Sequence, residues 1–258
     1  QSAAPPEQVE GSSKAEDLFL YTVKHVSLRK GQRMVLPVCE TTIKYKDVYT
    51  LDIPFAPPPE MRQHFHGQQN QIDRLLAQPK FMHKIRLTNK SEFPLTTAPA
   101  LIVRNDSVLA QSMMTYTAVG AATDLSITTA IDLKIKKKDK ETARVPNAVT
   151  WQGDQYGKVD LDGSIALTNY SDKATDLEIT RHVLGKVDSA DHNGSAEMVN
   201  VIEDEGFSAE QLYPVWWNWY SWPHWWGHFN GIGRLTWKTS LAPKQSVDLG
   251  YKWHYFWR

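Results

Sequence analysis

Apolar and polar residues alternate along most of the chain, in runs of about five to eight residues separated by turn-forming residues. The first such stretch, residues 17–54, reads DLFLYTVKHVSLRKGQRMVLPVCETTIKYKDVYTLDIP and contains a turn at Lys30-Gly31. The pattern resumes at Phe81, and again at residues 157–187 and 233–257. A period of two places every second side chain on the same face, which is typical of half-buried β-strands.

Short strands at this spacing, without long helical patterns between them, predict an all-β fold. We expect an antiparallel β-sandwich made of two Ig-like units that pack together. The first unit is predicted at residues 18–145 and the second at 146–258, with the first and last strands as candidates to share a sheet. Residues 1–17 are small, polar and proline-bearing, which predicts a disordered leader or linker and a further segment before it.

A seven-residue pattern occurs twice in the chain. Residues 85–91 read IRLTNKS and residues 165–171 read IALTNYS. In both, a strand runs into an Asn-x-Ser turn, where the two polar side chains can hydrogen-bond the nearby backbone. Two explanations stay open: the chain contains two related units, or common turn chemistry alone produces the repeat.

Charge and composition argue against two classes of partner. Lysine plus arginine and aspartate plus glutamate both number 29, so no net charge attracts nucleic acid or an anionic membrane. No apolar run reaches the roughly 18–20 residues that span a bilayer. The basic run KIKKKDK at residues 134–140 is interpreted as a solvated strand edge protected by lysines. We therefore expect neither nucleic-acid binding nor membrane insertion.

The chain lacks the common catalytic motifs. Its single cysteine, Cys39, follows the apolar stretch MVLPV and is interpreted as a small buried hydrophobe rather than a nucleophile. No glycine-rich phosphate loop, G-x-S-x-G motif or kinase motif set is present. The sequence thus favours a protein without catalysis.

Three histidines form a candidate metal site. His64 and His66 are two positions apart, so on a strand both rings would face the same side and could bind one zinc or copper ion. His83, on the following strand, could supply a third nitrogen. Because no carboxylate stands at a suitable spacing, we expect an exposed polar loop without a cofactor, and keep the metal as an alternative.

Residues 213–231, YPVWWNWYSWPHWWGHFNG, contain six of the ten tryptophans and are called the tryptophan tract below. We interpret the tract as a long loop whose inner indoles fill a gap in the core and whose outer indoles face a ligand. A membrane-seeking tip would need flanking Lys or Arg, which this stretch lacks. The candidate ligand-binding residues are Trp216, Trp217, Trp219, Tyr220, Trp222, Trp225, Trp226, His224 and His228.

His224 and His228 are four positions apart, a spacing that suits a metal only on a helix. Pro223 and Gly227 predict a loop instead, and no glutamate completes an H-E-x-x-H motif. The acidic run Glu203, Asp204 and Glu205 precedes the tract, and aromatic subsites beside paired carboxylates suit a glycoside-cleaving cleft. A polysaccharide-active or metal-dependent enzyme, using His64, His66 or His224 with these acids, is therefore the alternative function.

Several stretches resemble an uncharacterised bacterial β-rich domain family, found at the C-terminus of mucoidy-inhibitor-A-like proteins. They are LFLYTVKHVSLRKGQRMVLPV, YKDVYTLDIP, HKIRLTNKSEFPLTTAPALIVRNDSVLAQSMMTYTAVG and LTWKTSLAPKQSVDLGYKWHYF. The resemblance covers most of residues 18–256. It implies an envelope-associated domain without established catalytic machinery, normally preceded by a coiled-coil-bearing half. The segment 61–71 and the tryptophan tract depart from the family pattern.

Together these observations predict a non-catalytic module that binds a glycan or a protein partner through its aromatic loop. The resemblance implies a periplasmic, cell-envelope or extracellular location in a bacterium.

Overall fold

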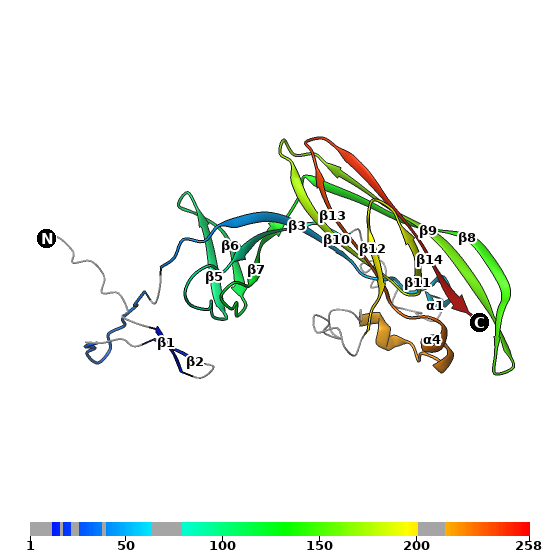
Figure 1. Ribbon diagram of the computed structural model, residues 1–258, viewed down its shortest axis with the longest axis horizontal. Helices are drawn as coiled ribbons and strands as arrows, with labels where there is room; N and C mark the ends of the chain where they lie inside the picture. Colours follow the sequence, from blue (N-terminus) through cyan, green and yellow to red (C-terminus); the bar gives the residue numbers. More distant parts are fainter. Residues whose placement is uncertain (1–11, 16–17, 22–25, 38–39, 63–78, 201–214) are drawn as a thin grey trace. The chain divides into compact units, whose positions relative to one another are not determined.

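The computed structural model describes residues 12–15, 18–21, 26–37, 40–62, 79–200 and 215–258 (Figure 1). Strands account for 58% of these residues and helices for 7%, so the predicted all-β class is confirmed.

The chain divides into two compact units. One consists of residues 1–47 and 84–127, and the other of residues 48–83 and 128–258. The predicted boundary between residues 145 and 146 falls inside strand β8, Leu133–Trp151.

The first unit contains two short antiparallel strand pairs. The strands are β1 (Ser12–Ala15), β2 (Leu18–Tyr21), β5 (Ala98–Arg104) and β6 (Ser107–Met114), of which β1 pairs with β2 and β5 with β6. The β5–β6 turn places Asn105 and Asp106 at φ angles of 47° and 61°, a region that these two residue types tolerate. Strands β4 (Met82–Thr88) and β7 (Ala122–Thr129) are neighbours, and Arg86 forms a bidentate ion pair with Asp124.

In the second unit, four strands lie side by side in the order β12, β13, β10 and β3. Their bounds are Ser195–Met198, Gly233–Leu241, Thr175–Val183 and Tyr45–Ile53. Strands β10 and β3 are parallel, so the expectation of a wholly antiparallel fold is wrong for this pair. The physical reason is the long stretch of chain between them, since parallel neighbours need a long crossover connection.

A second sheet has the order β11, β14, β9 and β8, and all its pairs are antiparallel (Figure 1). Besides β8 it consists of β11 (Lys186–Ala190), β14 (Ser246–Trp257) and β9 (Asp154–Asn169). As predicted, the lysine-rich run lies on an edge strand, β8, whose Lys134, Lys136, Lys138 and Lys140 are exposed.

Both sheets of the second unit contribute side chains to one hydrophobic core. Alternate residues of β10 are buried along its whole length, as a period of two requires. Fully buried members include Leu51, Ile179 and Leu235 from the first sheet, and Ile165, Leu167 and Leu249 from the second. Where the structure describes the chain, three short helical segments accompany the sheets: α1 (Pro59–Arg62), the 3₁₀ helix η1 (Val215–Trp219) and α4 (His224–Phe229).

The first copy of the repeated heptapeptide ends β4 with Asn89, which is fully buried. Its side-chain Nδ2 donates to the carbonyl oxygens of Phe93 at 2.9 Å and Thr117 at 3.1 Å. Its Oδ1 accepts from the backbone N–H of Ser91 at 3.1 Å and from the Ser91 hydroxyl at 2.7 Å. One amide therefore connects backbone groups of its own turn with the carbonyl oxygen of Thr117 in a distant segment.

The second copy ends β9 with Asn169, which is also fully buried. Its Nδ2 donates to the carbonyl oxygens of Lys173 at 2.8 Å and Leu241 at 3.2 Å. Its Oδ1 accepts from the backbone N–H and the hydroxyl of Ser171, at 2.9 and 2.7 Å. The two turns thus make the same set of bonds.

The likeness extends to the strands that follow each turn. In the first unit Leu95 pairs antiparallel with Thr117, and β5–β6 continue that pairing to the Asn105 turn. In the second unit Thr175 pairs antiparallel with Leu241, and β10–β13 continue it. Common turn chemistry accounts for the local bonds but not for these matching distant partners, which two related units would share.

We predict that Asn89→Ala and Asn169→Ala each lower the free energy of unfolding by about 2–3 kcal/mol, because the turn carbonyl groups lose one of their donors and the N–H groups of Ser91 and Ser171 lose their acceptor. Urea denaturation of each purified variant measures the loss. Asn105→Gly is the matched control, since it removes an exposed Asn-x-Ser amide and keeps a residue that tolerates positive φ. Losses no larger than the control's would contradict the structural role of the two amides.

Candidate functional site

A pocket of about 240 Å³ opens in the second unit. Its lining combines residues 55–59 and Arg62, the charged side chains of Lys137, Asp139 and Arg181, and two aromatic residues of β14, Trp253 and Tyr255. Apolar walls with a few converging polar groups are the usual composition of a small-molecule site.

The pocket's charged residues lie within the run that was interpreted as a solvated edge. Along β8, the partly buried or buried positions are Leu133, Ile135, Lys137 and Asp139, while the lysines between them are exposed. Sequence reasoning therefore missed Lys137 and Asp139. Leu133 and Ile135 face the core, and a period of two continued from them places Lys137 and Asp139 on the same face. This alternation is the sequence signal that indicates both residues.

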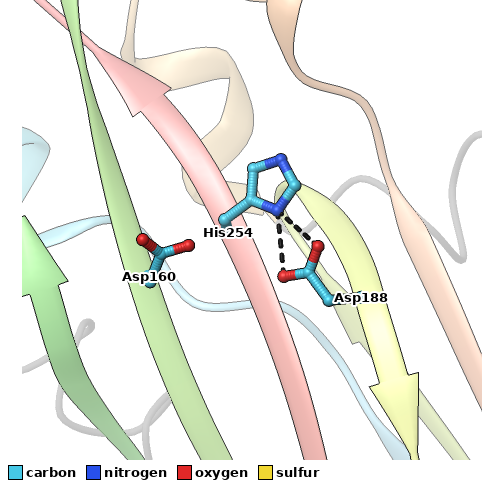
Figure 2. Close-up of side chains that lie close together, drawn as sticks. All are labelled: Asp160, Asp188 and His254. Carbon is cyan, nitrogen blue, oxygen red and sulfur yellow. Dashed lines mark hydrogen bonds and ion pairs between the residues drawn. The ribbon is translucent and has the colours of Figure 1, made fainter. Parts of the chain in front are cut away.

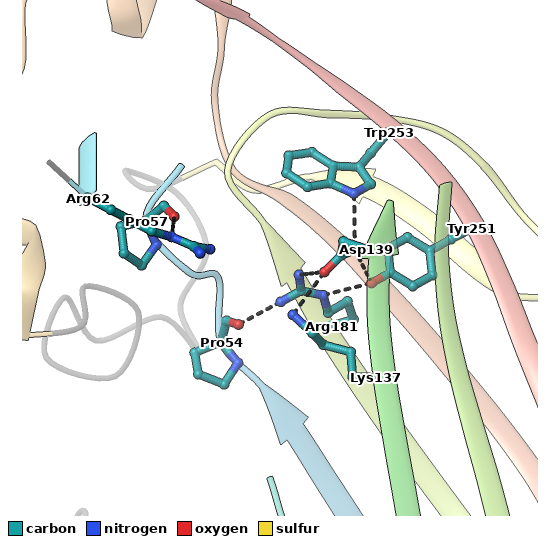
Figure 3. Close-up of polar contacts among 8 residues, drawn as sticks. All are labelled: Pro54, Pro57, Arg62, Lys137, Asp139, Arg181, Tyr251 and Trp253. Atoms are coloured by element: carbon teal, nitrogen blue, oxygen red, sulfur yellow. Dashed lines mark hydrogen bonds and ion pairs between the residues drawn. The ribbon is translucent and has the colours of Figure 1, made fainter. Parts of the chain in front are cut away.

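Asp139 is the centre of a buried hydrogen-bond network (Figure 3). Its carboxylate accepts from the Tyr251 hydroxyl at 2.6 Å and from the Trp253 indole N–H at 3.3 Å. It also pairs with the Lys137 ammonium at 2.8 Å and with Arg181 Nη2 at 3.1 Å. Four donors converge on one carboxylate, which therefore has its acceptor capacity filled.

Arg181 of β10 connects this network to the other sheet. Its side chain is 2% exposed. Nη1 donates to the carbonyl oxygen of Pro54, which follows β3, at 2.6 Å, and Nε donates to the Tyr251 hydroxyl at 3.2 Å. Because every side of the guanidinium has a partner, the cost of burying this charge is offset.

The network shifts the pKa values of its members. Burial alone would raise the pKa of Asp139, but the charges of Arg181 and Lys137 and the hydrogen bonds to Lys137 and Tyr251 lower it to about 2. Burial lowers the pKa of Lys137, and the positive charge of Arg181 lowers it further. Burial also raises the pKa of the Tyr251 hydroxyl. Two cations thus share a single carboxylate inside the pocket.

The rim of the pocket belongs to α1. Arg62 extends from this helix, and its Nε donates to the carbonyl oxygen of Pro57 at 3.2 Å (Figure 3). Glu60 accepts from the Tyr255 hydroxyl at 3.1 Å and pairs with Arg144 at 2.9 Å, which ties α1 to both β14 and β8. Glu141, the second carboxylate of the lining, forms a bidentate pair with Arg144.

The tryptophan tract lies behind two walls of the pocket. Phe55 packs edge-on against Trp216 and Trp217, with ring centroids 5.6 and 5.7 Å apart. Tyr255 contacts Trp226 at a centroid distance of 6.5 Å. The tract therefore supports the pocket walls from the core side.

The described indoles of the tract are mostly core residues. Trp216 and Trp226 are 1% and 4% exposed. Trp217 and Trp222 stack at 3.9 Å, and the Trp222 N–H donates to the carbonyl oxygen of Trp217 at 3.1 Å. Trp225 is half-buried, as are Trp217, Tyr220 and Trp222. The side chain of Trp219 lies outside the described part of the chain.

The prediction of a loop across the tract is wrong at His224 and His228, which lie on helix α4. Pro223 is the N-cap of this helix at a φ of −69°, a position where a missing N–H costs nothing. Gly227 sits within the helix rather than ending it. Both exposed imidazoles stack on Trp151, with centroids 5.9 Å away for His224 and 4.6 Å away for His228.

The predicted metal site is described only at His83. This residue stacks on Tyr49 with ring centroids 4.6 Å apart and an interplanar angle of 11°. His64 and His66 lie outside the described residues, as do Cys39 and the acids at 203–205. The zinc or copper alternative at the three histidines is therefore untested.

Another group with metal-ligating atoms lies on three adjacent strands: Asp160, Asp188 and His254 (Figure 2). Their ligand atoms are all within 4.8 Å of one another. Asp160 is opposite His254 across the β9–β14 ladder, and Asp188 is the extra residue of a bulge in β11. Because the extra residue of the bulge changes the strand register, no regular spacing in the sequence indicates this group.

Each side chain of this group has a polar partner close by. His254 Nδ1 lies 2.8 Å from the carboxylate of Asp188, and Asp160 pairs with Lys158. These contacts account for the position of all three side chains.

Within the described parts of the chain, every helix is too short or too polar to cross a bilayer. Comparisons with protein-family models, curated proteins and solved structures find no match to this chain. The resemblance to the C-terminal domain of mucoidy-inhibitor-A-like proteins stays a prediction.

We predict that Asp139→Asn lowers the free energy of unfolding by about 3–5 kcal/mol near neutral pH, because the buried Arg181 and the partly buried Lys137 lose their counter-charge. The folded pKa lies below the ordinary value, so this stabilisation is present above pH 3.8 and is lost as pH falls through about 2. The difference between wild type and variant should therefore shrink over that interval. Urea denaturation at several pH values measures it, with Asp248→Asn, an exposed carboxylate of β14, as the control. A difference that persists unchanged at pH 2 would contradict this assignment.

We predict that Trp216→Ala costs about 3–5 kcal/mol of folding stability, since it empties a fully buried site behind Phe55. The half-buried Trp225→Ala should cost less. Denaturation curves followed by far-UV circular dichroism compare the two. Equal losses would mean that the tract does not have the inner and outer positions described above.

Proposed function

We propose that this protein is a non-catalytic module that binds a glycan, with one sugar-sized unit held in the pocket at Trp253 and Tyr255. The observation that carries the proposal is the pocket itself, in which aromatic walls meet charged hydrogen-bond donors. Sugars present apolar ring faces together with many hydroxyl groups, so this combination suits them.

The size of the pocket supports a small ligand unit. Drug-sized ligands occupy pockets of about 300–1,000 Å³. A pocket of about 240 Å³ suits a single ring. Phe55, Trp253 and Tyr255 supply apolar contact, and Lys137 and Arg62 can donate to ligand oxygens.

In this proposal the tryptophan tract has a supporting role. Trp216 and Trp226 fix Phe55 and Tyr255 in place, because they pack against these rings from the buried side. Walls that are already held in position lose little side-chain entropy when a ligand binds. The half-buried Trp217, Trp222 and Trp225 are the candidates for contact with further units of a longer chain.

The carboxylates of the pocket support binding rather than catalysis. A general acid must hold a proton near the working pH. Asp139 has a pKa of about 2 and already accepts from four donors. Glu141 is committed to Arg144. Neither group fits the acid of a glycoside-cleaving pair, which argues against the enzyme alternative at this pocket.

A protein partner is the second candidate, favoured by the β5–β6 hairpin of the first unit. Large apolar side chains on these strands are exposed: 62% for Leu101, 54% for Val103, 64% for Val108 and 57% for Met113. Val103 and Val108 are directly opposite each other. Contiguous exposed apolar residues commonly mark contact sites.

Two further proposals concern fold detail and location. The shared core of the two sheets in the second unit supports an Ig-like sandwich, with the parallel β3–β10 pair as a departure from that pattern. A periplasmic, envelope or extracellular location in a bacterium rests on the family resemblance alone.

The pocket-filling variant Ala56→Trp tests the glycan proposal, because Ala56 lines the pocket and an indole there takes up the ligand's space. Glycan-array screening followed by calorimetry should give binding for the wild type and at least about a tenfold loss for the variant. Ala196→Trp, on an exposed position of β12, should bind like the wild type.

Two results would count against the proposal. Equal binding by Ala56→Trp and the wild type would place the ligand elsewhere. A flat response to neutral and acidic glycans alike would remove glycan binding as the function.

A further inference from the structure

We infer that the sugar unit held in the pocket carries one carboxylate and that the Lys137 ammonium binds this carboxylate directly. The ligand class is therefore a hexuronic acid or a glycan that contains one. This inference rests on the proposed function and specifies the ligand of the same pocket.

The first support is an uncompensated charge. Lys137 and Arg181 contribute two positive charges to the pocket, and Asp139 contributes one negative charge. The other lining acid, Glu141, shares Arg144 with Glu60, so those three groups carry one net negative charge. Arg62, which also lines the pocket, adds a further cation, and the pocket with its paired groups is left with an excess of one positive charge. A partly buried excess of one positive charge is costly unless a counter-ion is present, and a ligand carboxylate supplies one.

The second support is the availability of Lys137. Its ammonium has three N–H donors, and among the described residues its only ionic partner is Asp139. The side chain is 22% exposed and lines the pocket. Arg181, in contrast, is 2% exposed and has partners at Nη1, Nη2 and Nε. Lys137 is therefore the cation that a ligand can reach, and Arg181 positions Asp139 beside it.

The third support comes from the rim. Arg62 lines the same pocket, and within the described chain its guanidinium donates only to Pro57, from Nε. Besides burial and the charge of Arg181, the charge of Arg62 also lowers the pKa of Lys137. An anion that enters past Arg62 thus meets positive charge at the mouth and at the base of the pocket. Two cations along one path favour an acidic ligand over a neutral one.

A single carboxylate fits better than a phosphate group. The excess at the base is one charge, and a phosphate monoester carries close to two at neutral pH. A carboxylate carried on C5 of a sugar ring also projects outward, near the mean plane of the ring. Lys137 can therefore bind the carboxylate while the face of the ring contacts Tyr255 and Trp253. A sulfate ester has the same single charge, and the experiment separates it from the carboxylate.

The experiment measures binding of matched sugar pairs to the full chain by calorimetry. The probes are the methyl glycosides of glucuronic, galacturonic and mannuronic acid, each beside its neutral hexose and its 6-sulfated hexose. We expect at least one uronate to bind about tenfold or more tightly than its neutral partner, because a hydrogen bond to a charged group contributes more than a neutral one. Added salt should weaken the binding of the charged sugars and leave that of the neutral hexoses unchanged.

Variants connect the preference to Lys137. Lys137→Met should bring uronate affinity down to that of the neutral hexose, and Lys137→Arg should retain part of the preference. Lys158→Met, a lysine of β9 that pairs with Asp160 away from the pocket lining, is the matched control. Because Lys137→Met could affect folding, Arg62→Gln at the exposed rim gives a second reading, with an expected loss of about threefold to tenfold.

The outcomes separate the inference from the proposed function. Equal affinity for uronates and neutral hexoses, or a preference that survives both variants, would overturn the inference and leave glycan binding intact. A preference for the sulfated sugars would overturn the carboxylate assignment. Failure of every probe and of longer acidic and neutral glycans would overturn the proposed function as well.

Discussion

The fold of the second unit depends on one buried ion pair, Arg181 with Asp139. Arg181 comes from β10 in one sheet and Asp139 from β8 in the other, and Tyr251 of β14 bonds to both. Apolar contacts alone would allow two packed sheets to shift relative to each other. The hydrogen bonds and ion pairs of this network, in contrast, form at only one relative position of the two sheets. The same residues that fix the sheets also create the polar base of the pocket. If the pocket binds the proposed ligand, the same residues serve both stability and binding.

The aromatic residues form a continuous layer on one side of that pocket. Trp226 contacts both Tyr255 and Trp257 of β14, and Trp151 at the tip of the β8–β9 hairpin lies against α4. The layer holds the ends of the long strands of the second sheet against the short helices. Rigid aromatic packing of this kind stabilises a surface without requiring each ring to touch a ligand. The concentration of tryptophan is thus explained largely by packing.

Local patterns in the sequence predicted the local structure well. Alternation gave most of the strands, the lysine run gave the edge strand β8, and the two Asn-x-Ser turns form where the heptapeptide repeats. The prediction of half-buried strands is wrong at residues 26–37 and 40–44, which alternate in sequence but form no strand and are almost all exposed. The parallel β3–β10 pair and the Asp188 bulge were missed, because register between distant strands leaves no local signal. The α4 helix was missed because Pro223 and Gly227 suggested a loop, although proline is well tolerated at a helix start. Lys137 and Asp139 were missed because their charge was taken as evidence of exposure.

The matching turns at Asn89 and Asn169 also indicate where the two units differ. In the first unit a two-residue turn, Asn105 and Asp106, joins β5 to β6. In the second unit the corresponding connection between β10 and β13 is residues 184–232, which include β11, β12 and the tryptophan tract. The paired strands and their asparagine turn are thus complete in the first unit without such a segment. In the second unit the same place in the chain carries the residues that pack behind the pocket, so this one continuous segment, and not the strand pair, is what distinguishes the two units.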